Sequence, residues 1–150
     1  MKTSVSVMVL AGLLALAPQS ALWGRDNRGA MLRVVGACGD ASTRIENRIG
    51  EPAANPYLYM ASQVHAGLDG IARKLRAPRA TDAPYSDRAD KLPTSLSQAL
   101  DALLADTELT EAFGQSFVDY YVQIKRFEAS RFEAATDKDD FSRREYFSRL

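Results

Sequence analysis

The 150 residues suffice for one compact domain, since domains usually contain roughly 100–200 residues. Apolar residues make up 46% and charged residues 25% of the chain, which excludes a wholly disordered or collagen-like protein. Lysine and arginine total 19, as do aspartate and glutamate, so the chain lacks the basic excess typical of nucleic-acid binders. A single cysteine, Cys38, excludes an internal disulfide framework, and with one histidine it also excludes a zinc finger.

The N-terminal segment 1–21 is apolar. Lys2 precedes an apolar run over 7–17, which matches the core of a signal peptide and is shorter than the ~20 residues of a membrane-spanning helix. Its cleavage site is poor, because Pro18 directly follows the small-x-small triplet 15–17. We therefore predict a cytoplasmic protein without a membrane span. Export, or a buried helix or strand of a larger domain, remain the alternatives for this segment.

Two short strands are predicted next, over 31–35 and 43–48. The link between them contains Gly36 and Gly39 and suits a hairpin turn, so the strands are expected to pair in antiparallel fashion.

The second strand carries alternating charges. The two-residue period of a strand places Arg44, Glu46 and Arg48 on one face and Ile45 on the other. Arginine binds phosphate or carboxylate with a planar fork, and a carboxylate between two arginines stays ionised and can ligate a divalent cation. The pattern favours a site for an anionic, metal-bound ligand. A solvated edge of mutual salt bridges is the alternative.

The rest of the chain is predicted to be mainly helical. Asn55 and Pro56 suit the start of an amphipathic helix whose apolar residues recur at spacings of three and four as far as Leu75. His65 lies near this stripe and is expected to be a packing residue, because no second metal ligand is close in sequence. Segment 76–92 is rich in polar residues and proline and is predicted to be a loop.

Further helices follow the loop. Thr94 is predicted to cap one helix, and 107–113 is predicted to form a short helix that Gly114 ends. Aromatic residues at helical spacing over 117–127 indicate a long helix, with a short last segment at 141–147, and these aromatic stripes are predicted to lie in the core. The predicted fold class is therefore α+β, with a short antiparallel strand pair followed by four or five helices.

Four segments resemble, in register, motifs of the glutamine synthetase superfamily. Residues 23–33 resemble its W-G-x-D-N-R-x-x-x-x-R stretch, and 44–48 resemble its R-x-E-x-R strand. Residues 54–58 and 66–71 are similar to its A-N-P-Y-L and A-G-L-D-G-I motifs. The resemblance covers about residues 22–150 and looks closest to the branch that includes γ-glutamylpolyamine synthetases.

The resemblance implies an ATP-dependent ligase that phosphorylates the γ-carboxylate of glutamate and then displaces phosphate with ammonia or an amine. It implies that Arg28, Arg33 and Arg44 bind the ATP phosphates, and that Arg28 also acts on the transferred phosphoryl group as a catalytic residue. Arg48 is implied to bind glutamate, and Glu46 is implied to ligate the catalytic Mg²⁺ or Mn²⁺. Positioned arginines and metal ions stabilise the charge that such a phosphoryl group develops.

The matched region resembles the C-terminal part of the family's catalytic domain. Residues 22–150 are therefore predicted to be a C-terminal fragment, and 1–21 a signal-like or residual upstream segment. The family's other metal ligands lie upstream of this region, and Glu46 alone cannot complete a six-oxygen Mg²⁺ site. We expect the isolated chain to be inactive, and the ring-shaped homo-oligomers of the family are in doubt for it. The alternative is a non-catalytic interaction or structural remnant, with export left open.

Overall fold

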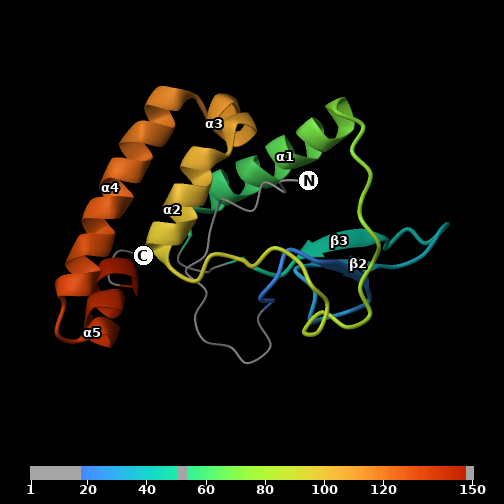
Figure 1. Cartoon of the computed structure of the whole chain (residues 1–150), viewed down its shortest axis with the longest axis horizontal. Helices are drawn as coiled ribbons and strands as arrows, with labels where there is room; N and C mark the ends of the chain where they lie inside the picture. The colour runs from blue at the N-terminus through green and yellow to red at the C-terminus, as the bar shows by residue number, and fades with distance from the viewer. Residues whose placement is uncertain (1–17, 51–53, 148–150) are drawn as a thin grey trace.

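The computed structural model of the protein describes residues 18–50 and 54–147, and it places a three-stranded sheet beside a group of helices (Figure 1). The strands are β1 (Trp23–Arg25), β2 (Leu32–Val35) and β3 (Arg44–Asn47), in the order β1-β2-β3. The α+β class is confirmed.

The hairpin of β2 and β3 matches the prediction. The two strands are antiparallel, with Arg33 opposite Glu46 and Val34 opposite Ile45. One face of the hairpin therefore carries Arg33, Arg44 and Glu46, and the other carries Leu32, Val34 and Ile45.

Strand β1 was not predicted, and it runs parallel to β2 with Trp23 opposite Leu32. Parallel neighbours usually need a long crossover, but the connection here is only residues 26–31. The connection is sufficient because β1 has three residues and is about 10 Å long, whereas six extended residues reach about 20 Å. Asp26, with φ of 47°, turns the chain at the end of β1.

Five α-helices and a last π-helical turn follow the sheet in the described part of the chain. They are α1 (Pro56–Ala72), α2 (Leu96–Ala105), α3 (Thr107–Phe113), α4 (Gln115–Ala134), α5 (Lys138–Ser142) and the π-helical turn η1 (Arg143–Phe147). Figure 1 shows α4 and α5 at the side far from the sheet, with α2 and α3 between them and α1. The helix count agrees with the prediction.

Side chains and glycine set the helix boundaries. The Asn55 carboxamide oxygen accepts hydrogen bonds from the backbone N–H groups of Tyr57 and Leu58, at 3.0 and 3.2 Å, which confirms the predicted start of α1. The prediction that Thr94 caps α2 is wrong, because the Ser95 hydroxyl accepts from the backbone of the third helical residue instead. Gly114, with φ of 87°, ends α3 as predicted.

The apolar core of the helical half is small and lies between α2, α3 and α4. Its buried residues are Leu100, Leu103, Leu109, Val118 and Val122. Val118 is 1% exposed and lies where the three helices meet.

The prediction that the aromatic stripe of α4 is core is wrong for most of its length. Phe117, Tyr120 and Phe127 are all exposed, and Phe117 stacks on Tyr121 with ring centroids 6.1 Å apart. The reason is that the described helices cover only the side of α4 that carries Val118. His65 contacts the Phe113 ring at 5.5 Å, as expected of a packing residue.

A buried polar contact fixes the C-terminal turn to α4. The Tyr146 hydroxyl donates to one Glu128 oxygen, and the Lys125 ammonium donates to the other at 2.7 Å. Burial, followed by the hydrogen bond to Glu128, raises the pKa of Tyr146. This contact holds η1 against the long helix.

Segment 73–95 runs from α1 to α2 and packs against the sheet, mostly as the predicted loop. The Trp23 indole donates to the Pro78 carbonyl at 2.7 Å, and Ser20 forms an isolated antiparallel bridge with Lys91. Within the described residues, none of the helices is long and apolar enough to cross a membrane.

Candidate functional site

The charged face of the sheet brings Glu46 between two arginines. The Arg33 guanidinium donates to Glu46 Oε2 and the Arg44 guanidinium donates to Glu46 Oε1, both at 2.9 Å. The cross-strand register produces the first contact, and the two-residue period along β3 produces the second. The structure therefore confirms that Arg44 and Glu46 share a face.

Asp26 is a second carboxylate at this site. Its Oδ1 accepts from Arg33 Nη2, so Arg33 joins Asp26 and Glu46 through different nitrogens. The Arg33 side chain is 16% exposed, Glu46 30% and Arg44 54%, so the solvent-facing arginine is Arg44. Hydrogen bonds to Asp26 and then to Glu46 raise the pKa of Arg33 further above its usual value.

Glu46 is held in its ionised form. The hydrogen bond from Arg33, followed by the charges of Arg33 and Arg44, lowers the pKa of Glu46 below its ordinary value of 4.5. The carboxylate is therefore negative at neutral pH, as a metal ligand must be.

Arg48 and Arg28 form a separate contact. The Arg48 side chain donates to the backbone carbonyl of Arg28, and the Arg48 N–H donates to the Met31 carbonyl at 2.9 Å. Of the four arginines that the resemblance implies at the site, Arg33 and Arg44 contact Glu46, whereas the Arg48 side chain contacts the backbone at Arg28. Arg28 lies in the connection between β1 and β2, and Arg48 directly follows β3.

The turn between the strands supports this geometry. Asp40 Oδ1 accepts hydrogen bonds from the Ser42 N–H at 2.8 Å and from the Ser42 hydroxyl at 2.7 Å. Both hydrogen bonds lower the pKa of Asp40, and the one from the hydroxyl has the larger effect. Gly36 has φ of 96°, and a Cβ there would lie 2.6 Å from Thr43 Oγ1. Glycine is therefore required at this position of the turn.

The described residues do not form a metal site by themselves, since no group of three or more His, Cys, Asp or Glu side chains is gathered among them. Both Glu46 oxygens also accept from arginine. The donor set fits a phosphate better, because the guanidinium of Arg44 reaches solvent and can bind an anion.

Sequence reasoning missed Asp26 and the support from the turn. Asp26 lies seven residues before Arg33, and only the parallel pairing of β1 with β2 brings the two together. The available signal was that Asp26 lies in the motif that begins at Trp23, but a position in a motif does not tell which way the Asp26 side chain points.

Comparison with known proteins identifies the family. A family model described as "Glutamine synthetase, catalytic domain" matches residues 13–144. The chain belongs to the glutamine synthetase family. The match includes the whole described site, from Asp26 to Arg48, and therefore supports the resemblance of the four motifs.

Individual relatives agree with this assignment. The γ-glutamylanilide synthase of an Acinetobacter species is 51% identical over 119 residues, which are 79% of this chain and 24% of that protein. The glutamine synthetase of Methanocaldococcus jannaschii is 38% identical over 128 residues, 79% of this chain and 28% of that protein. The chain thus spans about a quarter of the length of these curated relatives.

A solved structure supports the fold. The complex of GmaS with ADP superposes with a TM-score of 0.74 and 26% sequence identity, over 97% of this chain and 36% of that chain. The described sheet and helices therefore have the arrangement of a part of a glutamine synthetase-type chain.

Proposed function

We propose that this chain carries the phosphate-binding corner of an ATP-dependent ligase that joins glutamate to ammonia or an amine through γ-glutamyl phosphate. The single observation that carries the proposal is the Arg33–Glu46–Arg44 contact, within a region that matches the family's catalytic domain. The acceptor is proposed to be an amine, because the relative that is 51% identical is named for an anilide product.

Each site residue has a proposed role. Arg44 reaches solvent and binds the ATP phosphates together with Arg33 and Arg28, and Arg28 also stabilises the phosphoryl group during transfer. Arg48 binds the carboxylate of glutamate through its fork. Asp26 is a positioning residue, because it holds one edge of the Arg33 guanidinium.

When bound, ATP supplies the phosphoryl group, and this chain's residues bind and orient it. Glu46 is proposed to be this chain's contribution to a Mg²⁺ or Mn²⁺ site. Because the described residues gather no further ligands around it, residues from outside them are needed to complete that site.

A second candidate is a non-catalytic interaction or structural remnant. It is favoured by the lack of a metal-ligand cluster among the described residues.

A chimera separates the two candidates. In the Acinetobacter γ-glutamylanilide synthase, the region that matches this chain is replaced by the corresponding residues of this chain. We expect the chimera to form the anilide from ATP, glutamate and aniline, whereas the isolated chain releases no phosphate with ATP and glutamate.

Variants of the chimera test the site. Arg44→Ala and Glu46→Ala are each expected to lower kcat/KM by about 100-fold or more, since loss of one positioned group has this effect in other enzymes. The control is Arg126→Ala, which removes an exposed arginine that pairs with Asp101 between α4 and α2. A folded chimera without activity, or one that tolerates both site substitutions, contradicts the proposal.

A further inference from the structure

The connection between β1 and β2 holds Arg28 in a tight turn. The Asn27 carboxamide oxygen accepts from the Gly29 N–H at 3.0 Å, and the Ala30 N–H donates to the Asn27 carbonyl at 3.3 Å. Asparagine side chains commonly close turns in this way, by a hydrogen bond to the backbone two residues further on. Arg28 lies inside the turn and is exposed. Its backbone is therefore held from both sides, while its side chain stays open to a ligand.

A segment far along the chain contacts this connection. We call residues 81–87 the 81–87 turn. The Thr81 N–H donates to the Trp23 carbonyl at 2.9 Å, and the Asn27 carboxamide nitrogen donates to the Asp82 carbonyl at 3.3 Å. Asn27 thus uses both ends of its amide, the oxygen for its own turn and the nitrogen for the 81–87 turn.

Gly29, on the other side of Arg28, also touches the 81–87 turn. A Cβ at Gly29 would lie 2.7 Å from Pro84 Cγ and 3.0 Å from Tyr85 Cε2, which is closer than a side chain can come without a shift. The missing side chain lets the two segments approach each other. Both sequence neighbours of Arg28 therefore contact the same distant turn.

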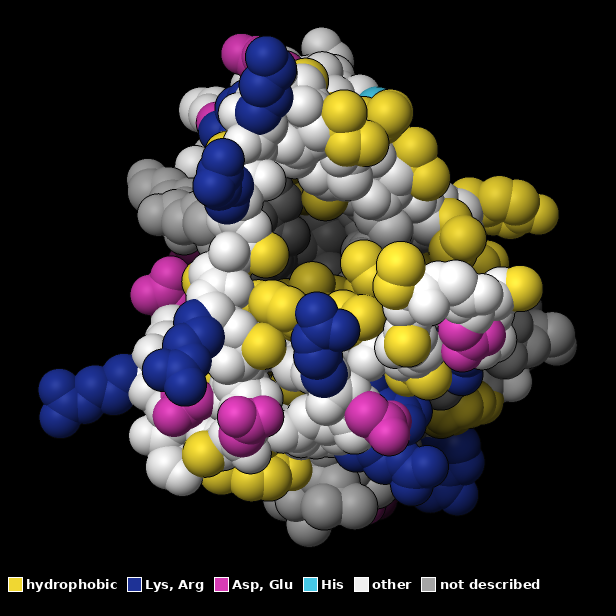
Figure 2. All heavy atoms as spheres, turned by 90° about the vertical axis from the view of Figure 1, so that its right-hand side faces the viewer, with side chains coloured by type: hydrophobic (Ala, Val, Ile, Leu, Met, Phe, Trp, Pro, Cys, Tyr) yellow, Lys and Arg dark blue, Asp and Glu magenta, His cyan; other side chains and the backbone are white. Residues whose placement is uncertain are grey.

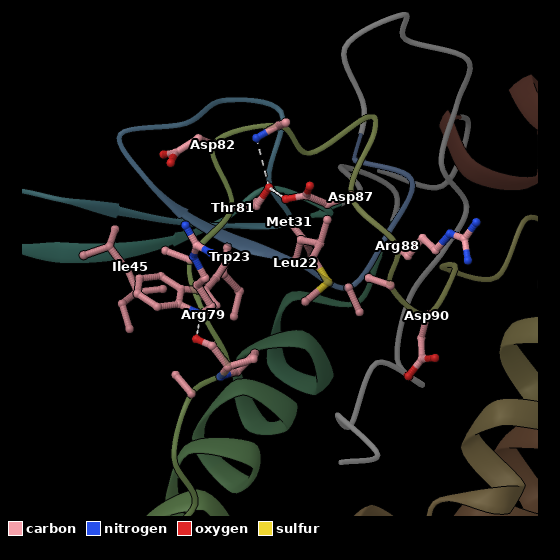
Figure 3. A pocket seen from close by; sticks show the side chains of 18 residues that line it. Leu22, Trp23, Met31, Ile45, Arg79, Thr81, Asp82, Asp87, Arg88 and Asp90 are labelled. Carbon is pink, nitrogen blue, oxygen red and sulfur yellow. Dashed lines mark hydrogen bonds between the residues drawn. The ribbon is translucent and has the colours of Figure 1, made fainter.

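The 81–87 turn is closed by its own hydrogen bonds. Thr81 is 3% exposed, its hydroxyl donates to Asp87 Oδ2, and it accepts from the Ala83 N–H at 3.1 Å (Figure 3). The Asp87 N–H in turn donates to the Ala83 carbonyl at 2.9 Å. The buried hydroxyl of Thr81 therefore joins the start of the turn to its end.

One side of the 81–87 turn faces open space. Thr81, Asp82 and Asp87 line a cavity of about 980 Å³, beside which hydrophobic side chains gather (Figure 2). Because close packing is lacking on that side within the described residues, the hydrogen bonds of Thr81 and Asn27 set the shape and place of the turn.

We propose that the 81–87 turn positions Arg28 for phosphoryl transfer, with Asn27 and Thr81 as positioning residues. Asn27 joins the turn to the backbone beside Arg28, and Thr81 keeps the turn closed. The proposal rests on the proposed function for the role of Arg28, whereas the fixing of the Arg28 backbone is a property of this chain alone. A misplacement of about 1 Å can lower a rate by about 100-fold, so such support matters for a catalytic arginine.

NMR relaxation of the full chain without ligand tests the fixing of Arg28. In Asn27→Ala we expect the heteronuclear NOE of the Arg28 and Gly29 amides to fall toward that of a flexible loop, while the Arg44 amide in β3 keeps its value. Thr81→Val, which removes the hydroxyl and keeps the shape, should act in the same direction. Thr81→Ser, which keeps the hydroxyl, should resemble the wild type. Unchanged Arg28 and Gly29 amides, or an equal fall throughout the sheet, overturn the proposal.

Kinetics of the chimera described above test the effect on the reaction. Asn27→Ala and Thr81→Val are each expected to lower kcat/KM for ATP by about 10-fold, and Thr81→Ser should restore it. The matched control is Thr110→Val, which removes another buried hydroxyl, one that donates to the Leu103 carbonyl at 3.2 Å in the helical half. It should change kcat/KM by less than about two-fold, because it is far from the sheet. Equal losses in Thr81→Val and Thr110→Val refute a specific role of the turn.

A double-mutant cycle shows whether Asn27 acts through Arg28. In an Arg28→Ala background, Asn27→Ala should lower kcat/KM by less than about two-fold further, since the group that it positions is gone. The same loss in both backgrounds overturns the proposal. An inactive chimera refutes the ligase function instead, and the relaxation measurement then still decides whether the 81–87 turn fixes Arg28.

Discussion

Replacing Tyr146 by phenylalanine tests how the C-terminal turn is held to α4. The variant keeps the ring and removes the hydroxyl that donates to Glu128, whose side chain is only 11% exposed. Lys125 still donates to the other carboxylate oxygen at 2.7 Å, so one buried oxygen loses its partner and the charge stays paired. Hydrogen bonds to charged groups contribute about 1.5–3 kcal/mol, so we expect a loss of about 2 kcal/mol in the free energy of unfolding.

This loss is measurable by thermal and urea unfolding followed by circular dichroism. For a chain of this size about 1 kcal/mol corresponds to about 2–4 °C, so the Tm at pH 7 is expected to fall by about 4–8 °C. Because the pKa of Tyr146 is raised above its unfolded value near 10, its contribution is fully present below pH 10. That contribution is lost as the pH rises from 10 toward the folded pKa, so the stability difference between wild type and variant should shrink there.

The control is Tyr120→Phe, which alters an exposed tyrosine of α4 and should change stability by less than about 0.5 kcal/mol. The reasoning is refuted if Tyr146→Phe matches this control at pH 7. It is also refuted if the difference between wild type and Tyr146→Phe is unchanged from pH 7 to above pH 10.

Three further tests, with five substitutions in all, probe other elements. Leu103→Ala in the small core is expected to cost about 3 kcal/mol in urea unfolding, and a cost below 1 kcal/mol would show that the core is not where we place it. Asn55→Ala removes the cap of α1 and should cost about 1 kcal/mol, whereas Asn55→Gly should cost only a few tenths. Gly36→Ala places a Cβ 2.6 Å from Thr43 Oγ1 and should destabilise the protein more than Gly39→Ala, because Gly39 also has a positive φ but has open space around its Cβ position. Equal losses of stability in the two variants would argue against the close contact at Gly36.

The sequence predicts those features that depend on local patterns. The two-residue period places Arg44 and Glu46 on one face, the glycines of the link specify a hairpin, and Asn55-Pro56 begins a helix. Each of these depends on residues within a few positions of one another, so neighbouring side chains and backbone preferences decide it.

Features that depend on distant contacts could not be predicted. The pairing of β1 with β2, which brings Asp26 to Arg33, depends on a short parallel connection that has no strong local signal. The apolar periodicity of α1 gives the direction of its stripe relative to its own axis, but not which side faces the described sheet. The aromatic residues of α4 show the same limit, because periodicity does not reveal how much of the surrounding chain covers them.

The most direct test of the central claim is an ATP titration of the full chain, followed by NMR of the arginine Nε–H signals. The claim is that Arg28, Arg33 and Arg44 bind phosphate beside Glu46. We predict that the Arg28 and Arg44 signals shift progressively, with affinity no tighter than about millimolar because few contacts offset the cost of ordering the ligand. The signals of Arg126 and Arg131, which pair with carboxylates in the helical half, should stay in place. If Arg28 and Arg44 do not respond while those distant arginines do, the charged face of the sheet is a solvated ion-pair edge and not a phosphate site.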